Sequence, residues 1–243
     1  MPTGLLLPSL STDVYTAAQP HAPIHVFIHG GAWRMLSKRE SAFPAENFVA
    51  AGAHFVALGF ALLPNVSLAE MVAQVRRAVA WTYTNAERFG GDRSRLYLSG
   101  HSSGAHLAAN VLVTDWGREF ELLEAPVKGA LCISGIYELQ PVRLSARNQY
   151  VKLDEHSEHE LSAQRSLQRL DCPVVFGYGE LESDEFKRQA REFADAVART
   201  NNAVQLIEGK GQNHFEIIET LAEPDGLLGR IALEQMGLAR RAG

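Results

Sequence analysis

Short apolar runs alternate with longer segments of helical periodicity along most of this chain. Short apolar runs bounded by turn residues are typical of buried strands, whereas apolar residues spaced three or four apart predict amphipathic helices. The predicted strands span residues 24–28, 54–58, 96–99, 130–134, 174–178 and 204–208. The predicted helices span residues 40–51, 68–83, 103–116 and 185–199, and another begins near His214. Parallel strands need long crossover connections, so this alternation predicts an α/β fold with a mostly parallel central sheet and helices on both faces.

The domain organisation follows from the same pattern. The 243 residues contain no internal repeat, low-complexity tract or Gly/Ser-rich linker, so we expect a single domain over residues 1–243. Residues 137–170 are less regular and more polar, and we interpret them as a small, cap-like helical excursion over the sheet. Ser67 is the predicted N-cap of the helix at residues 68–83.

Charge and cysteine content narrow the class of protein. The formal net charge is −5 and there is no basic cluster, which argues against nucleic acid as a partner. The apolar run at residues 5–7 is too short to span a membrane and lacks the charged flank of a signal peptide. Cys132 and Cys172 both fall in apolar runs, so we expect reduced core thiols rather than a disulfide or a metal site. A cytoplasmic location is the default expectation.

The pattern G-x-S-x-G occurs at residues 100–104, between a predicted strand and a predicted helix. In this context a tight turn exposes the serine hydroxyl above the sheet, and glycines at both ends let the strand and the helix approach each other. The N–H of Ser103 would lie at the helix N-terminus, where it could donate to a developing oxyanion. We therefore predict that Ser102 is a catalytic nucleophile. The alternative is a chance match to a short motif.

A glycine-rich turn, H-G-G-A-W at residues 29–33, follows the first predicted strand. Backbone N–H groups of such a turn can stabilise the negative charge on a carbonyl oxygen during acyl transfer. We expect His29 to hold this loop, and Trp33 either to form a wall for an aromatic substrate or to pack the loop. The predicted oxyanion hole comprises Gly30, Gly31, Ala32 and Ser103.

A general base and its acid are expected after the later strands, because the chain order in hydrolases with this serine turn is serine, acid, histidine. His214 follows the last predicted strand, at the carboxyl edge of the sheet, where the base belongs. The acid candidates after the strand at residues 174–178 are Glu180, Glu182 and Asp184, and spacing alone barely separates them. Asp184 could instead cap the helix that follows.

Several stretches resemble the kynurenine formamidase (arylformamidase) group of the α/β-hydrolases. The H-G-G-x-W motif at residues 29–33 is similar to the hallmark of that group, and the resemblance extends from about residue 13 to about residue 221. It implies an α/β-hydrolase fold and a Ser–His–acid triad that needs no metal and no organic cofactor. In the family pattern the acid stands three residues before E-F-x-R-Q, which identifies Glu182, although relatives usually carry Asp there.

The resemblance also implies an activity. A triad of Ser102, Glu182 and His214 would hydrolyse N-formyl-L-kynurenine to kynurenine and formate. Two alternatives remain: a carboxylesterase of broad scope for short-chain esters, and a non-catalytic binding module. The expected partner is a small amide or ester, with no nucleic acid or membrane. Relatives carry a longer N-terminal segment that can cover the pocket, so we expect a more open site here, or coverage by a partner subunit in a homodimer.

Overall fold

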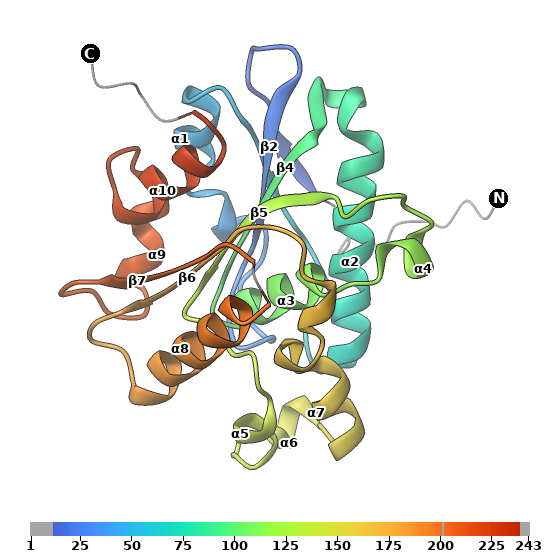
Figure 1. Ribbon diagram of the computed structural model, residues 1–243, viewed down its shortest axis with the longest axis vertical. Coiled ribbons are helices and arrows are strands. Elements are labelled where there is room, and N and C mark those ends of the chain that lie inside the picture. Colours follow the sequence, from blue (N-terminus) through green and yellow to red (C-terminus); the bar gives the residue numbers. More distant parts are fainter. Residues whose placement is uncertain (1–11, 201, 239–243) are drawn as a thin grey trace.

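A seven-stranded sheet forms the centre of the molecule, with strand order β1-β3-β2-β4-β5-β6-β7 (Figure 1). The computed structural model describes residues 12–200 and 202–238, so the apolar run at residues 5–7 lies outside the described part. β1 pairs antiparallel with β3, and the other neighbouring strands pair in parallel, which confirms the predicted α/β class. The strands are β1 (Asp13–Tyr15), β2 (Ala22–Ile28), β3 (His54–Ala57), β4 (Gly91–His101), β5 (Val127–Ile133), β6 (Val174–Gly179) and β7 (Val204–Gly209).

Helices cover both faces of the sheet and bury the side chains that alternate along the strands. Val26 and Cys132 belong to a core that also holds residues of α2, α3 and α8, whereas Phe27 and Leu131 belong to a second core with α1, α9 and α10. The α-helices are α1 (Ala45–Ala50), α2 (Leu68–Asn85), α3 (Ser103–Leu112), α4 (Trp116–Phe120), α5 (Gln140–Arg143), α6 (Asn148–Val151), α7 (Glu155–Leu161), α8 (Asp184–Ala198), α9 (Glu216–Glu219) and α10 (Leu227–Gln235).

Local signals in the sequence account for several element boundaries. The Ser67 hydroxyl accepts a hydrogen bond from the N–H of Glu70 at 3.1 Å, which confirms its predicted role as the N-cap of α2. Gly90 ends the short 3-10 helix before β4 with a left-handed φ of 80°. Cys132 and Cys172 are free and buried, as expected. Burial raises the pKa of Cys172 to about 12, so this thiol stays protonated and unreactive.

The predicted cap-like stretch contains the short helices α5, α6 and α7, which lie together at one end of the molecule (Figure 1). Two 3-10 helices, Ala163–Arg165 and Leu167–Arg169, lead from α7 back towards β6. Within the described part of the chain, no helix is long and apolar enough to cross a membrane.

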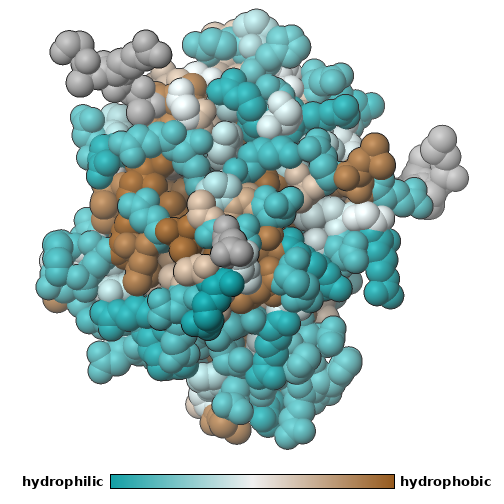
Figure 2. Space-filling view, viewed as in Figure 1, coloured by the Kyte–Doolittle hydropathy of each residue, from teal (hydrophilic) through white to brown (hydrophobic). Residues whose placement is uncertain are grey.

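β7 forms one edge of the sheet, and β1 forms the other. Figure 2 shows a mostly hydrophilic surface with an apolar area over the region where β6 and β7 lie in Figure 1. Among the strands that the structure describes, β7 pairs with β6 alone, and its Leu206 is 40% exposed. The parallel strands all point the same way, so their carboxyl ends lie together at one end of the sheet. The candidate site is assembled at that end.

Candidate active site

Ser102 lies in the tight turn between β4 and α3, with a strained backbone conformation of φ 55° and ψ −122°. The glycines on either side permit this turn. A Cβ on Gly100 would lie 2.4 Å from the carbonyl oxygen of Gly104, and a Cβ on Gly104 would lie 2.2 Å from that of Ile28. The Ser102 N–H donates to the carbonyl oxygen of Ile133 at the end of β5, at 2.9 Å. The strand–turn–helix geometry expected for a nucleophile is therefore present.

The structure brings Ser102, His214 and Glu182 together from the ends of three strands. His214 follows β7, and its Nε2 lies 3.0 Å from the Ser102 hydroxyl. Its Nδ1 lies 3.0 Å from Oε2 of Glu182, which follows β6. A carboxylate only accepts hydrogen bonds, so Nδ1 carries the ring proton and the Nε2 lone pair faces the serine. This tautomer can remove a proton from the Ser102 hydroxyl.

Glu182 has a fully buried side chain held by further donors. Its Oε1 accepts hydrogen bonds from the Ser134 hydroxyl at 2.5 Å and from the Gly179 N–H at 2.7 Å. Burial alone would raise the pKa of Glu182, but the hydrogen bonds from His214, Gly179 and Ser134 outweigh it and lower the pKa below its ordinary value. The carboxylate is therefore ionised at neutral pH and keeps the histidine in one orientation.

The other two acid candidates have different surroundings. Asp184 is exposed and is the first residue of α8. Ser183, rather than Asp184, occupies the N-cap position. Glu180 accepts a hydrogen bond from the N–H of Gly211 at 2.8 Å. The geometry thus selects Glu182 as the partner of His214 and favours neither alternative.

The glycine-rich loop at residues 29–33 lies against the nucleophile. A Cβ on Gly30 would be 3.2 Å from Cβ of Ser102, and Gly31 and Ala32 have φ values of 100° and 51°. Within the described residues, the N–H groups of Gly31, Ala32 and Ser103 have no hydrogen-bond acceptor, so they are available to an oxyanion. His29 supports this loop as expected, since its Nδ1 lies 2.9 Å from the Gly30 carbonyl oxygen.

Trp33 lies in the core rather than on the pocket wall, which favours the packing alternative over the substrate-binding assignment. Its side chain is 0% exposed. Its indole N–H donates to Nδ1 of His106 at 3.2 Å, and Nε2 of His106 lies 2.9 Å from the carbonyl oxygen of Leu161. Its backbone N–H donates to the Ser103 hydroxyl at 3.2 Å, which ties the loop to α3. The physical reason for the burial is that the indole fills the space between the loop and α3.

A pocket of about 400 Å³ opens in front of Ser102 and His214. Its size suits a small organic substrate. Its other lining residues are mostly apolar or aromatic. They are Phe27, His29, Gly30, Gly31, Ala32, Met35, Leu36, Glu40, Ser41, Phe43, His101, Arg147, Phe186, Phe215 and Ile218.

Sequence reasoning did not identify three residues that position the histidine. The Nε2–H of His101 donates to the carbonyl oxygen of His214 at 2.8 Å, and burial followed by the charge of His214 lowers the pKa of His101 to about 3. The Phe186 ring packs 4.5 Å from the His214 ring. Ser134, which holds Glu182, follows β5 directly, and a polar residue after a central strand is the signal that would have found it.

The chain is similar to several known proteins. The BD-FAE family model matches residues 12–130. The kynurenine formamidase of Danio rerio is 36% identical over 93% of this chain and 77% of its own length, and that of Salmo salar has the same identity and coverage. The crystal structure of a putative thioesterase from Silicibacter sp. TM1040 superposes with a TM-score of 0.79 at 25% identity, over 90% of this chain and 79% of that protein. The chain is therefore a serine hydrolase with the α/β-hydrolase fold, and it belongs to the kynurenine formamidase family.

Proposed function

We propose that the protein is an arylformamidase that hydrolyses N-formyl-L-kynurenine to kynurenine and formate, a step of tryptophan catabolism. The observation that carries the proposal is the relay from Glu182 through His214 to Ser102, which faces a pocket with aromatic walls. Relatives named kynurenine formamidase support this substrate.

The roles of the residues follow from their geometry. Nε2 of His214 takes the proton of the Ser102 hydroxyl while Oγ attacks the formyl carbon, and Glu182 stabilises the imidazolium that forms. The N–H groups of the loop at Gly30, Gly31 and Ala32, together with that of Ser103, hold the oxyanion. His214 then protonates the aniline nitrogen as the C–N bond breaks, which leaves a formyl ester on Ser102. A water molecule activated by the same histidine releases formate and restores the serine.

The substrate class fits the chemistry of this site. An aniline is a better leaving group than an alkyl amine, so esterase-type machinery is sufficient to cleave an aryl formamide. Phe186 and Phe215 line the pocket and provide flat apolar surface for an aryl ring. The second candidate is a carboxylesterase for short-chain esters, since the same relay attacks an ester carbonyl and the pocket is open.

Purified protein assayed with N-formyl-L-kynurenine and p-nitrophenyl acetate separates the candidates. We expect kcat/KM to be much larger for the formamide, and turnover of esters alone would overturn the proposal. Ser102→Ala and His214→Ala are each expected to lower kcat by about 10³-fold or more while the far-UV circular dichroism stays native. Absence of all turnover, with no labelling of Ser102 by a serine-directed phosphonate, would favour a non-catalytic binding module.

We also propose a cellular location and an assembly state for the enzyme. Two free, buried thiols suit a reducing compartment, and we place the enzyme in the cytoplasm. A homodimer in which a partner subunit covers the open pocket should elute at twice the monomer mass of 26.7 kDa in size-exclusion chromatography with light scattering. Elution as a monomer would contradict the homodimer.

A further inference from the structure

Among the described residues that line the pocket in front of Ser102, two carry a formally charged side chain, Glu40 and Arg147. They come from different segments: Glu40 begins the 3-10 helix Glu40–Ala42, and Arg147 immediately precedes α6. The rest of the lining is mostly apolar or aromatic. One cation and one anion in an apolar pocket are the complement of a zwitterion that also carries an aryl group.

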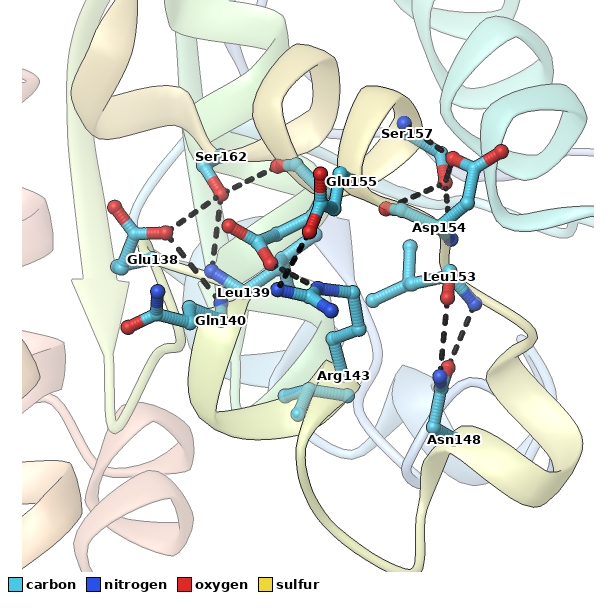
Figure 3. Close-up of polar contacts among 12 residues, drawn as sticks. Glu138, Leu139, Gln140, Arg143, Asn148, Leu153, Asp154, Glu155, Ser157 and Ser162 are labelled. Carbon is cyan, nitrogen blue, oxygen red and sulfur yellow. Dashed lines mark hydrogen bonds and ion pairs between the residues drawn. The ribbon is translucent and has the colours of Figure 1, made fainter.

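Arg147 differs from Arg143 and Arg165, which lie in the same segment at residues 137–170. Arg143 forms ion pairs with Glu155 and Glu158, and Figure 3 shows its guanidinium directed at carboxylates of α7. Arg165 pairs with Glu138 and Glu158. Within residues 12–200 and 202–238, the guanidinium of Arg147 has no hydrogen bond, ion pair or ring contact. The donors of Arg147 therefore remain available to a ligand.

The backbone that carries Arg147 is held in place although its side chain is free. Its N–H donates to the Ser145 hydroxyl at 3.2 Å, and its carbonyl oxygen accepts from the N–H of Val151 at 3.0 Å. The next residue, Asn148, bonds both the N–H and the carbonyl oxygen of Leu153, as Figure 3 shows. These contacts fix the starting point of a long side chain at the pocket wall, which lowers the entropic cost of binding through it.

The same segment is anchored to the body of the enzyme. The Ser162 hydroxyl accepts a hydrogen bond from the N–H of Leu139 and donates to the carbonyl oxygen of Glu158 at 2.6 Å (Figure 3). The carbonyl oxygen of Leu161 lies 2.9 Å from Nε2 of His106 in α3, the helix that begins next to Ser102. The segment that carries Arg147 is thus tied by hydrogen bonds to α3.

We propose that Arg147 is a specificity-determining residue that binds the carboxylate of an amino-acid group on the substrate. A guanidinium presents its N–H donors as a planar fork that matches the two oxygens of a carboxylate. This inference rests on the proposed function, since N-formyl-L-kynurenine carries such a carboxylate at the end opposite its formamide. It assigns the selectivity for an amino-acid substrate over a neutral aryl ester to one residue.

Two ligands that differ in the amino-acid group test the assignment without any turnover. L-Kynurenine carries the carboxylate and the ammonium, whereas 2'-aminoacetophenone keeps the aryl ketone and lacks both. The measurement is the ratio of their dissociation constants, obtained by isothermal titration calorimetry for the wild type, Arg147→Met and Arg147→Lys. We expect Arg147→Met to raise the dissociation constant of L-kynurenine about tenfold relative to that of 2'-aminoacetophenone. Arg147→Lys should raise it less.

Arg39→Met is the matched control, because Arg39 is exposed, lies next to Glu40 in the sequence and does not line the pocket. It removes the same charge and should leave the ratio as in the wild type. A ratio that Arg147→Met does not alter, or equal losses for both ligands, would overturn the inference. A failure of N-formyl-L-kynurenine turnover would count against the proposed reaction alone, since the binding ratio is read from non-reacting ligands.

Discussion

The hydroxyl group of Ser134 donates a hydrogen bond of 2.5 Å to Oε1 of Glu182, on the carboxylate whose other oxygen holds His214. Ser134 is fully buried and has a left-handed backbone φ of 54°. A non-glycine residue in that conformation is strained, and it persists where the surrounding structure compensates for the strain. The contact fixes the direction of the Glu182 carboxylate. Ser134 thus acts as a positioning residue for the relay.

Removal of this hydroxyl should reduce turnover and move the pH profile. Ser134→Ala is expected to lower kcat about tenfold, because a hydrogen bond to a charged group contributes about 1.5–3 kcal/mol. With one donor removed, the pKa of Glu182 rises, so the acid limb of the kcat/KM profile should move to higher pH. Steady-state assays on N-formyl-L-kynurenine across pH 4–9 would measure both effects.

A second variant separates the hydroxyl from the backbone strain. Ser134→Gly removes the same donor but suits the φ of 54°, so it should show the same kinetic change with a smaller loss of stability. Ser94→Ala, at an exposed position of β4, is the matched control and should leave the profile unchanged. A pH profile that Ser134→Gly leaves as in the wild type would show that the hydroxyl does not position Glu182.

Glu182 and Asp184 are separated by two positions, and their variants should behave very differently. Glu182→Gln is expected to lower kcat by about 10³- to 10⁴-fold, because the amide can no longer orient and stabilise the protonated histidine. Asp184→Ala should change kcat by less than about twofold, since Asp184 is exposed at the start of α8. Single-turnover and steady-state kinetics with matched melting curves would measure this. A larger loss in Asp184→Ala would refute the assignment of the acid.

The sheet and the turn that carries Ser102 could be predicted because both rest on local patterns. Apolar runs of strand length alternate with helical periods, and this alternation was sufficient to predict that most strands of the central sheet pair in parallel. G-x-S-x-G at residues 100–104 needs glycine at both ends for steric reasons that act within a few residues. The position of His214 after β7 followed from the shared edge at which parallel strands end.

Other features depend on contacts between distant segments. Sequence spacing could not separate Glu182 from Asp184 as the acid. The turn after β6 directs Glu182 inward to His214 and places Asp184 at the surface, and this turn cannot be read from spacing. Trp33 is buried by its contact with His106, which lies 73 positions away. The single helix expected near His214 is instead α9, a 3-10 turn and α10, because Pro224 and Gly226 interrupt the helical backbone between them.

The burial of Trp33 predicts a variant that affects stability more than substrate binding. Trp33→Phe keeps most of the apolar volume but leaves Nδ1 of His106 without its donor. It should lower the free energy of unfolding by about 1–3 kcal/mol, whereas KM for N-formyl-L-kynurenine should stay within about twofold. Trp81→Phe, at a position 41% exposed in α2, is the control and should have little effect on unfolding in urea. A large rise in KM at unchanged stability would instead identify Trp33 as a substrate wall.

Buried neutral histidines predict that the enzyme loses stability in mild acid. Burial lowers the pKa values of His25 and His101 to about 3 and that of His106 to about 4, all from an ordinary value of 6.5. In the unfolded chain each of these histidines takes up a proton near pH 6.5, whereas in the folded protein each stays neutral at that pH. Proton uptake on unfolding therefore does not reduce the free energy of unfolding above pH 6.5. Below that pH the free energy of unfolding falls progressively, until the pH reaches the pKa values of these histidines in the folded protein. Three such groups give a slope of about 4 kcal/mol per pH unit between roughly pH 6 and pH 4.

Urea unfolding at pH 7.5, 6.0 and 5.0 would measure this slope directly. His25→Gln should reduce it by about one third, because one of the three protons is no longer taken up on unfolding. His25 lies within β2, with its Nε2 2.6 Å from the Ser99 hydroxyl and its ring 4.1 Å from the Phe48 ring. The variant will therefore also lower stability at pH 7.5, and only the slope is diagnostic. His156→Gln, at an exposed position of α7, should leave the slope unchanged. A free energy of unfolding that stays constant from pH 7.5 to pH 5.0 would show that these histidines are already protonated in the folded enzyme.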